Sequence, residues 1–117
     1  MNEFIEIAKT SDLTNGQMKG YTLGNSKVLL ARVDNNFYAA SNVCPHMGGT
    51  LSEGTLTGTI VTCPRHGSQF DLKNGSVIRW TKYTGVFGSI VKMLKSPRPL
   101  HTYKLHIAGE SIKVKIL

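Results

Sequence analysis

Residues 44–71 read CPHMGGTLSEGTLTGTIVTCPRHGSQFD and contain the only two cysteines of the chain. Each cysteine is followed closely by a histidine. The first cluster is Cys44-Pro45-His46, and the second, after sixteen intervening residues, is Cys63-Pro64-Arg65-His66. Thiolate and imidazole are the ligands of zinc and of iron–sulfur centres, and two short clusters on separate loops can converge on one ion or cluster. The spacing therefore predicts a metal centre built from two loops.

Three other uses of these residues can be compared with that prediction. A disulfide between Cys44 and Cys63 would leave both neighbouring histidines unexplained, and nothing in the sequence indicates an oxidising compartment. Cysteine-protease chemistry needs one cysteine with a distant histidine and does not require two matched loops. A zinc site remains the alternative. Zinc accepts two cysteines and two histidines, although its usual spacing pairs cysteine with cysteine and histidine with histidine.

Outside this stretch, most segments are short, strand-like in composition and separated by Gly, Asn and Asp. Two of the hairpins are expected to turn at Thr57-Gly58 and at Asn74-Gly75. The pattern predicts an all-β protein, a small antiparallel barrel or sandwich, with the two metal-binding loops at about 42–50 and 62–71 of a single domain, 1–117. The expected strands are 3–8, 19–23, 27–33, 36–41, 55–56, 59–62, 69–71, 77–79, 102–107 and 111–116.

The segment 80–95 differs from the rest because its apolar residues recur at helical spacing. Two glycines weaken the early part of this pattern, each by roughly 1 kcal/mol relative to alanine. We therefore expect one short helix over about 87–95, ended by the Ser96-Pro97-Arg98-Pro99 sequence. Its simplest interpretation is a helix packed against the barrel, with a docking or membrane-surface role as the alternative.

The composition limits the class of protein further. The chain has 117 residues, of which 40% are apolar and 18% charged, as expected for one globular domain and not for a large multidomain enzyme. No apolar run approaches the ~20 residues that span a bilayer. The N-terminus carries acidic residues where a secretory signal has basic ones. We expect a cytoplasmic protein.

The net charge of +7 is confined to the last third of the chain. Residues 1–78 contain six basic and six acidic side chains, whereas residues 79–117 contain eight basic side chains and only Glu110. Such an asymmetry is typical of proteins that meet an acidic protein, a membrane surface or a nucleic acid, or of a solvated basic face. The charge does not choose among these, although no nucleic acid is expected and peripheral membrane contact stays an open alternative.

The cluster region closely resembles that of Rieske-type [2Fe–2S] ferredoxins, with C-x-H, a spacer of sixteen residues and then C-x-x-H. This resemblance implies one [2Fe–2S] cluster per chain, held by Cys44 and Cys63 on the inner iron and by His46 and His66 on the outer iron. It also implies a small antiparallel barrel with two loops that clasp the cluster. The similarity extends beyond the four ligands to Pro45, Gly48, Pro64, Gly67, Phe70 and Asp71.

Two departures place the chain within the family it resembles. Respiratory members have an extra cysteine in each loop, and these two form a disulfide; the matching residues here are Gly49 and Arg65. Respiratory members also use a Ser and a Tyr as hydrogen-bond donors to sulfur; Ser68 matches the Ser, while Phe70, which has no hydroxyl, stands where the Tyr would be. Losing one donor predicts a low to intermediate reduction potential, which the charge of Arg65 partly offsets. Ser68, Gly48 and Arg65 are thus the expected residues that tune the cluster.

The resemblance implies one-electron transfer, with the chain carrying electrons from a reductase to an acceptor such as an oxygenase. The sequence shows no substrate site of its own. The alternatives are a small subunit of a fixed redox complex, similar to that of nitrite reductases, and a structural zinc module. The longer segment 80–98 favours the fixed complex. In either redox assignment the partners are other redox proteins, with acidic docking surfaces as the expected match to the basic third of the chain.

Overall fold

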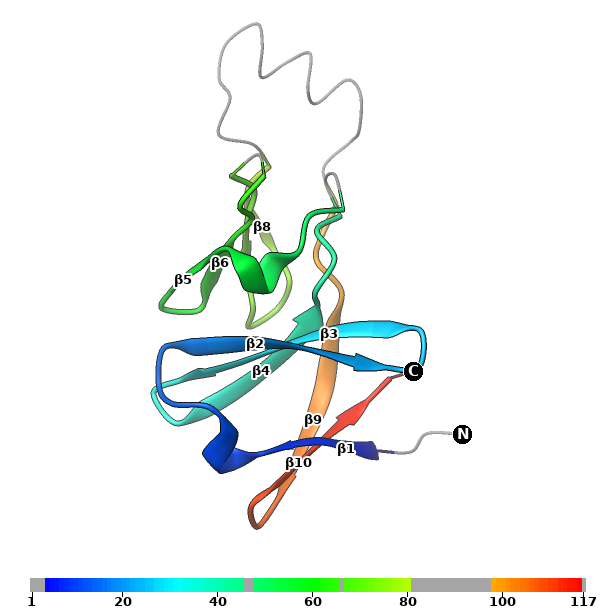
Figure 1. Ribbon diagram of the computed structural model, residues 1–117. Coiled ribbons are helices and arrows are strands. Elements are labelled where there is room, and N and C mark those ends of the chain that lie inside the picture. The colour runs from blue at the N-terminus through cyan, green and yellow to red at the C-terminus, as the bar shows by residue number, and fades with distance from the viewer. Residues whose placement is uncertain (1–3, 46–47, 66, 81–97, 117) are drawn as a thin grey trace, which may run out of the picture.

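The computed structural model describes residues 4–45, 48–65, 67–80 and 98–116, which form two antiparallel sheets (Figure 1). The larger sheet has six strands in the order β1-β10-β9-β4-β3-β2, and the smaller has four in the order β5-β6-β7-β8. The strands of the larger sheet are β1 (Phe4–Lys9), β2 (Gln17–Leu23), β3 (Ser26–Val33), β4 (Asn36–Ser41), β9 (Thr102–Ala108) and β10 (Ser111–Lys115). Those of the smaller sheet are β5 (Thr55–Thr57), β6 (Ile60–Thr62), β7 (Gln69–Asp71) and β8 (Val77–Arg79).

The larger sheet curves around one of two hydrophobic cores. Side chains alternate along each strand, so Val28 and Leu30 of β3 face this core, whereas Leu29 of the same strand belongs to the second core. The core also receives Leu13, which follows the 3-10 turn η1 (Thr10–Asp12). Neither Cys44 nor Cys63 belongs to this core. The buried members of this core are Ala8, Leu13, Val28, Leu30, Ala39, Ile112 and Val114.

The second core lies between the other face of β3 and β4 and the smaller sheet, and it includes both cysteines. Phe70 is completely buried there and meets the ring of Trp80 edge-on, with 6.3 Å between the ring centroids. The 3-10 turn η2 (Leu51–Glu53) closes this core through the buried Leu51. The predicted metal centre is therefore anchored in packed side chains. The remaining buried members are Leu29, Ala31, Ala40, Val61, Leu72 and Leu100.

The predicted fold class is confirmed, and every strand expected from the sequence has a counterpart within the described residues. Helical structure in these residues is limited to the two 3-10 turns. The turn expected at Asn74-Gly75 lies within the connection 72–76 that joins β7 to β8. Within this connection the Gly75 N–H donates to the Asp71 carbonyl (2.7 Å) and Gly75 has a φ of +78°.

The helix expected over 87–95 lies outside the described residues. Within those residues, no helix has the length and apolar character needed to cross a bilayer.

Candidate metal centre

Two loops at one end of the described part of the molecule carry the predicted ligands, and an antiparallel pair of residues closes each of them. The first loop follows β4 and is closed by the bridge between Val43 and Thr50. The second joins β6 to β7 and is closed by the pair Thr62 and Gln69. In both cases eight residues run from one paired residue to the other. In Figure 1 both loops lie at the end of the molecule away from β1 and β10.

Backbone hydrogen bonds fix the shape of the first loop. The Cys44 N–H donates to the Gly49 carbonyl (2.8 Å), and the Cys44 carbonyl accepts from the Gly48 N–H (2.9 Å). Gly48 has a φ of +73°, which lies in the left-handed region that favours glycine. Both backbone groups of the first cysteine are therefore held within its own loop.

The second loop repeats this arrangement. The Cys63 N–H donates to the Ser68 carbonyl (2.8 Å), and the Cys63 carbonyl accepts from the Gly67 N–H (3.2 Å). Gly67 also has a φ of +73°. The two loops thus share a backbone conformation in which the cysteine comes first, a proline second and a left-handed glycine fifth. Each loop therefore supplies one cysteine held by the same backbone hydrogen bonds, as a metal site shared between the two loops requires.

The cysteines themselves are suited to hold a metal cluster. Cys44 is 2% exposed and Cys63 is 3% exposed, and no disulfide joins them. The first loop lies directly against the second at this point, because a Cβ added to Gly49 would lie 2.8 Å from the Cys63 Sγ. Buried thiol sulfurs reached by two loops are what a thiolate-bound cluster needs, so the described residues fit the predicted group.

The two histidines of the predicted ligand set, His46 and His66, lie outside the described residues. The full set of four ligands therefore stays a prediction from the sequence. Among the residues that the structure describes, no group of three or more His, Cys, Asp or Glu side chains gathers as a metal site. Cys44 and Cys63 supply only two ligands by themselves.

Of the three residues expected to tune the cluster, Ser68 is completely buried, and its carbonyl accepts the hydrogen bond from the Cys63 N–H. Its hydroxyl donates a hydrogen bond to the Trp80 carbonyl. Arg65 is exposed, and its Cγ and Cδ lie close to Gly49 of the first loop. Gly48 provides the left-handed turn of the first loop. Their effect on a cluster remains a prediction.

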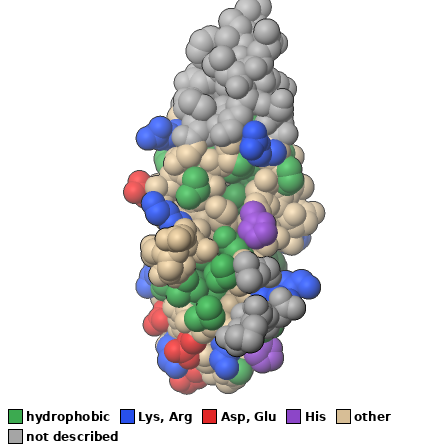
Figure 2. All heavy atoms as spheres, turned by 90° about the vertical axis from the view of Figure 1, so that its right-hand side faces the viewer, with side chains coloured by type: hydrophobic (Ala, Val, Ile, Leu, Met, Phe, Trp, Pro, Cys, Tyr) green, Lys and Arg blue, Asp and Glu red, His purple; other side chains and the backbone are tan. Residues whose placement is uncertain are grey.

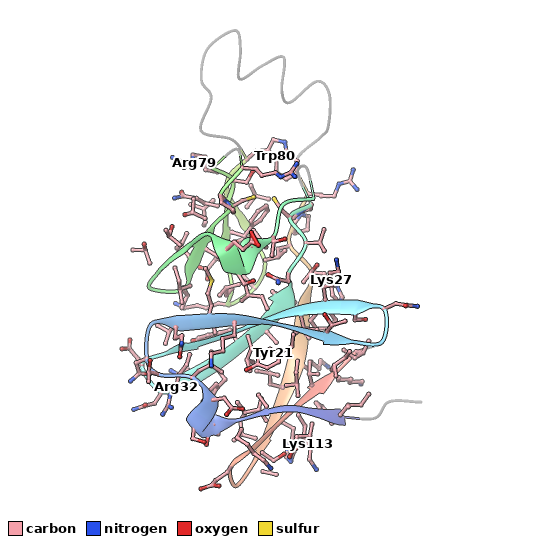
Figure 3. All side chains as sticks on the ribbon, in the orientation of Figure 1. Tyr21, Lys27, Arg32, Arg79, Trp80 and Lys113 are labelled. Carbon is pink, nitrogen blue, oxygen red and sulfur yellow. The ribbon has the colours of Figure 1, made fainter. Side chains whose placement is uncertain are left out.

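Two further contacts brace the loops and were not expected from the sequence. The Arg79 Nε donates to the Gly67 carbonyl (3.0 Å), which ties β8 to the second loop (Figure 3). The buried Asn42 side chain accepts from the Ser52 N–H (2.8 Å) and donates to the Ser52 Oγ (2.9 Å). These bonds join the start of the first loop to η2 at its end. Both contacts link residues ten or more positions apart, so no local sequence pattern predicts them.

Comparison with known proteins agrees with this geometry. Residues 3–103 match the family described as Rieske [2Fe-2S] domain. This match covers most of the chain, and the chain belongs to that family. Membership implies a [2Fe–2S] cluster, in keeping with the two buried cysteines.

Relatives of two kinds share this sequence. The chain is 39% identical over 71 residues to apoptosis-inducing factor 3 of Homo sapiens, covering 61% of this chain but only 12% of that protein. It is 32% identical over 76 residues to the ferredoxin component of the naphthalene 1,2-dioxygenase system of Pseudomonas putida, covering 65% of this chain and 73% of that protein. The same kind of domain therefore occurs alone and within a much larger chain.

Solved structures share the whole fold. The ferredoxin of carbazole 1,9a-dioxygenase from Nocardioides aromaticivorans IC177 superposes with a TM-score of 0.78 at 22% identity, over 96% of each chain. A chain from a complex of reduced oxygenase and oxidised ferredoxin in carbazole 1,9a-dioxygenase gives a TM-score of 0.76 at 24% identity, over 98% of this chain and 94% of that one. At these identities the likeness establishes the fold.

Proposed function

We propose that this chain is a Rieske ferredoxin that carries single electrons from a reductase to an acceptor enzyme. The observation that carries the proposal is the pair of equivalent loops, each holding a buried cysteine at its first position and a left-handed glycine at its fifth. We assign Cys44, His46, Cys63 and His66 as the four ligands. Residues 1–117 then form one domain devoted to this single centre.

When bound, a cluster with two imidazole ligands supplies a one-electron couple at a potential of roughly −150 to +300 mV, above that of clusters held by cysteines alone. The protein's part is to hold and shield it. The core around Phe70 and Trp80 fixes the small sheet that carries the second loop. Burial of Cys44 and Cys63 keeps water away from their sulfurs. Backbone hydrogen bonds fix both loops before any electron arrives, which limits reorganisation.

An oxygenase is the acceptor class that we favour. Relatives and structures that match over most of their own length include ferredoxins of naphthalene and carbazole dioxygenase systems, one of them in complex with its oxygenase. We place the protein in the cytoplasm with its redox partners. Two exposed aliphatic side chains, Val43 (42%) and Ile78 (50%), are next to Cys44 and Arg79 in sequence and can serve as apolar contacts for a partner.

Positive charge is the second feature of this proposed docking end. Arg65 and Arg79, both exposed, belong to or contact the second loop. Figure 2 shows Lys and Arg side chains on both sides of the molecule at the upper limit of the described surface. Opposite charges across an interface accelerate association, most strongly at low ionic strength. We therefore expect an acceptor or reductase with an acidic docking face.

A second candidate is a redox domain that works inside a larger assembly. The chain spans only 12% of apoptosis-inducing factor 3, the relative with the higher sequence identity. A domain of this kind can therefore be permanently joined to other modules. A partner that copurifies in a fixed ratio would favour this candidate, whereas a monomer that exchanges freely would favour the mobile carrier.

The first experiment is to purify the chain and measure its iron and acid-labile sulfide, its visible spectrum and its voltammetry from neutral to alkaline pH. We expect equal amounts of iron and sulfide, a red-brown protein and a reversible one-electron wave. The wave should lie below the range of respiratory Rieske proteins and fall with pH only above neutrality, where a ligating histidine loses its proton. A colourless protein containing zinc would contradict the proposal.

A further inference from the structure

Arg65 lies across the seam between the two loops. A Cβ added to Gly49 of the first loop would lie 3.2 Å from the Cγ of Arg65 and 3.3 Å from its Cδ. The same point is 2.8 Å from the Cys63 Sγ. The aliphatic part of Arg65 and the sulfur of Cys63 therefore converge on one small volume, and the backbone of Gly49 forms its other wall.

The space beside Gly49 explains why this residue has no side chain. Gly48 needs glycine for its φ of +73°, but Gly49 is not among the residues with positive φ. Real Cβ atoms essentially never approach a neighbour as closely as 2.8 Å, so alanine at position 49 would push Cys63 and Arg65 away. Gly49 thus allows the two loops to meet, and Arg65 fills the space between them.

The two parts of the Arg65 side chain are in different surroundings. The residue as a whole is exposed, while its Cγ and Cδ rest against the first loop. This is the usual arrangement of an arginine that buries its aliphatic stem and keeps its guanidinium in water. The stem and the Cys63 sulfur border the same small volume beside Gly49, and the guanidinium, bonded to Cδ, lies in the neighbourhood of that sulfur.

We propose that Arg65 is a positioning residue of the cluster, because its side chain bridges the two loops. Its stem closes the seam beside Cys63, and its charge lies close to the centre. This inference rests on the proposed function. The stem should slow the loss of a bound cluster by excluding water and chelators. The charge should favour the reduced state, which is the more negative one, and so raise the reduction potential.

Three substitutions separate the stem from the charge. Arg65→Met keeps the stem without the charge, Arg65→Lys keeps both in a different form, and Arg65→Ala removes both. We expect Arg65→Ala to lose its cluster to a chelator roughly tenfold faster than the wild type, by analogy with other residues that support metal ligands. Arg65→Met and Arg65→Lys should stay close to the wild-type rate. The potential should fall in Arg65→Met and Arg65→Ala but not in Arg65→Lys.

The control is Lys104→Met, which removes an equal charge from β9 in the larger sheet and should change neither quantity. Loss of the cluster from Arg65→Met as fast as from Arg65→Ala would overturn the role of the stem. Equal potentials in all variants would overturn the role of the charge. These comparisons are made against a wild type that holds its cluster, so failure of the wild type to bind one would instead count against the proposed function.

A test on the cluster-free protein covers variants that do not incorporate iron. Gly49→Ala, Arg65→Ala and the double variant form a double-mutant cycle for the free energy of unfolding. Because the two residues touch, their effects should be non-additive. Additive effects would mean that the stem does not contact the first loop, and the proposal that Arg65 bridges the two loops would then be wrong.

Discussion

Gly48 and Gly67 occupy the same position in their respective loops, and each has a backbone φ of +73°. The N–H of each donates to the carbonyl of the cysteine four residues earlier, Cys44 or Cys63. This turn brings the chain back towards the cysteine. Because both loops use it, the geometry of the centre depends on two glycines as well as on its ligands.

The left-handed conformation of Gly67 can be tested directly. Gly67→Ala should destabilise the protein by about 1–2 kcal/mol, which is the cost of placing an L-residue with a Cβ in this region. Gly67→Asn should cost less, because asparagine tolerates a positive φ better than alanine does. Chemical denaturation of the two variants and the wild type measures this difference. Equal losses in both variants would mean that space and not backbone conformation requires the glycine.

The ligand assignment makes a spectroscopic prediction. Cys44→Ser and His66→Ala should each abolish the visible absorbance of the cluster, because a cluster that loses one of four ligands is not retained. The larger sheet should stay folded in both, since a separate core of described residues without Cys44 supports it. His106→Ala, on the exposed face of β9, is the matched histidine control and should keep its colour. An unchanged visible spectrum in either ligand variant would refute the assignment.

Sequence periodicity was enough to predict the strands but not the contacts that hold the loops. Alternating side chains and turn residues specify β-hairpins locally, so β9 and β10 were found within a residue or two of their ends. The bond from Arg79 to Gly67 and the fit of Arg65 beside Gly49 depend on how separate segments pack. A pattern of residue types along the chain does not predict such packing. The sequence showed that Gly49 and Arg65 stand where respiratory members have a disulfide. It did not show that these two residues are in contact.

Ser68 is a second residue whose contact in the structure was not predicted from the sequence. The sequence indicated a hydroxyl that donates to sulfur, and the structure shows this hydroxyl donating to the Trp80 carbonyl in a completely buried position. Ser68→Ala should therefore destabilise the protein by roughly 0.5–1.5 kcal/mol, the usual net contribution of one hydrogen bond. Denaturation measures this effect. A stability equal to that of the wild type would show that the bond to Trp80 contributes nothing.

Voltammetry of the same Ser68→Ala variant tests the role expected from the sequence. If the hydroxyl also serves a cluster sulfur, its removal should lower the reduction potential, because a donor to sulfur favours the reduced state. An unchanged potential, together with reduced stability, would limit Ser68 to the contact with Trp80. The two measurements thus separate support of the fold from tuning of the centre.

The pH dependence of folding should contain a contribution from Glu6 on the edge strand β1. Hydrogen bonds from the Ser111 hydroxyl and from the Lys9 Nζ (3.0 Å) lower the pKa of this carboxyl from its usual value of 4.5. A carboxyl with a lower pKa in the folded than in the unfolded protein binds fewer protons when folded, so its contribution to stability is present above the unfolded pKa. That contribution is lost as the pH falls through the folded pKa.

Unfolding free energies measured by urea denaturation from neutral to acidic pH should therefore decline less steeply in Glu6→Gln and in Ser111→Ala than in the wild type. Glu110→Gln makes the same change of charge in the turn between β9 and β10 and serves as the matched control. If Glu6→Gln were as steep as the wild type, the bonds at the β1–β10 edge would not contribute to acid stability.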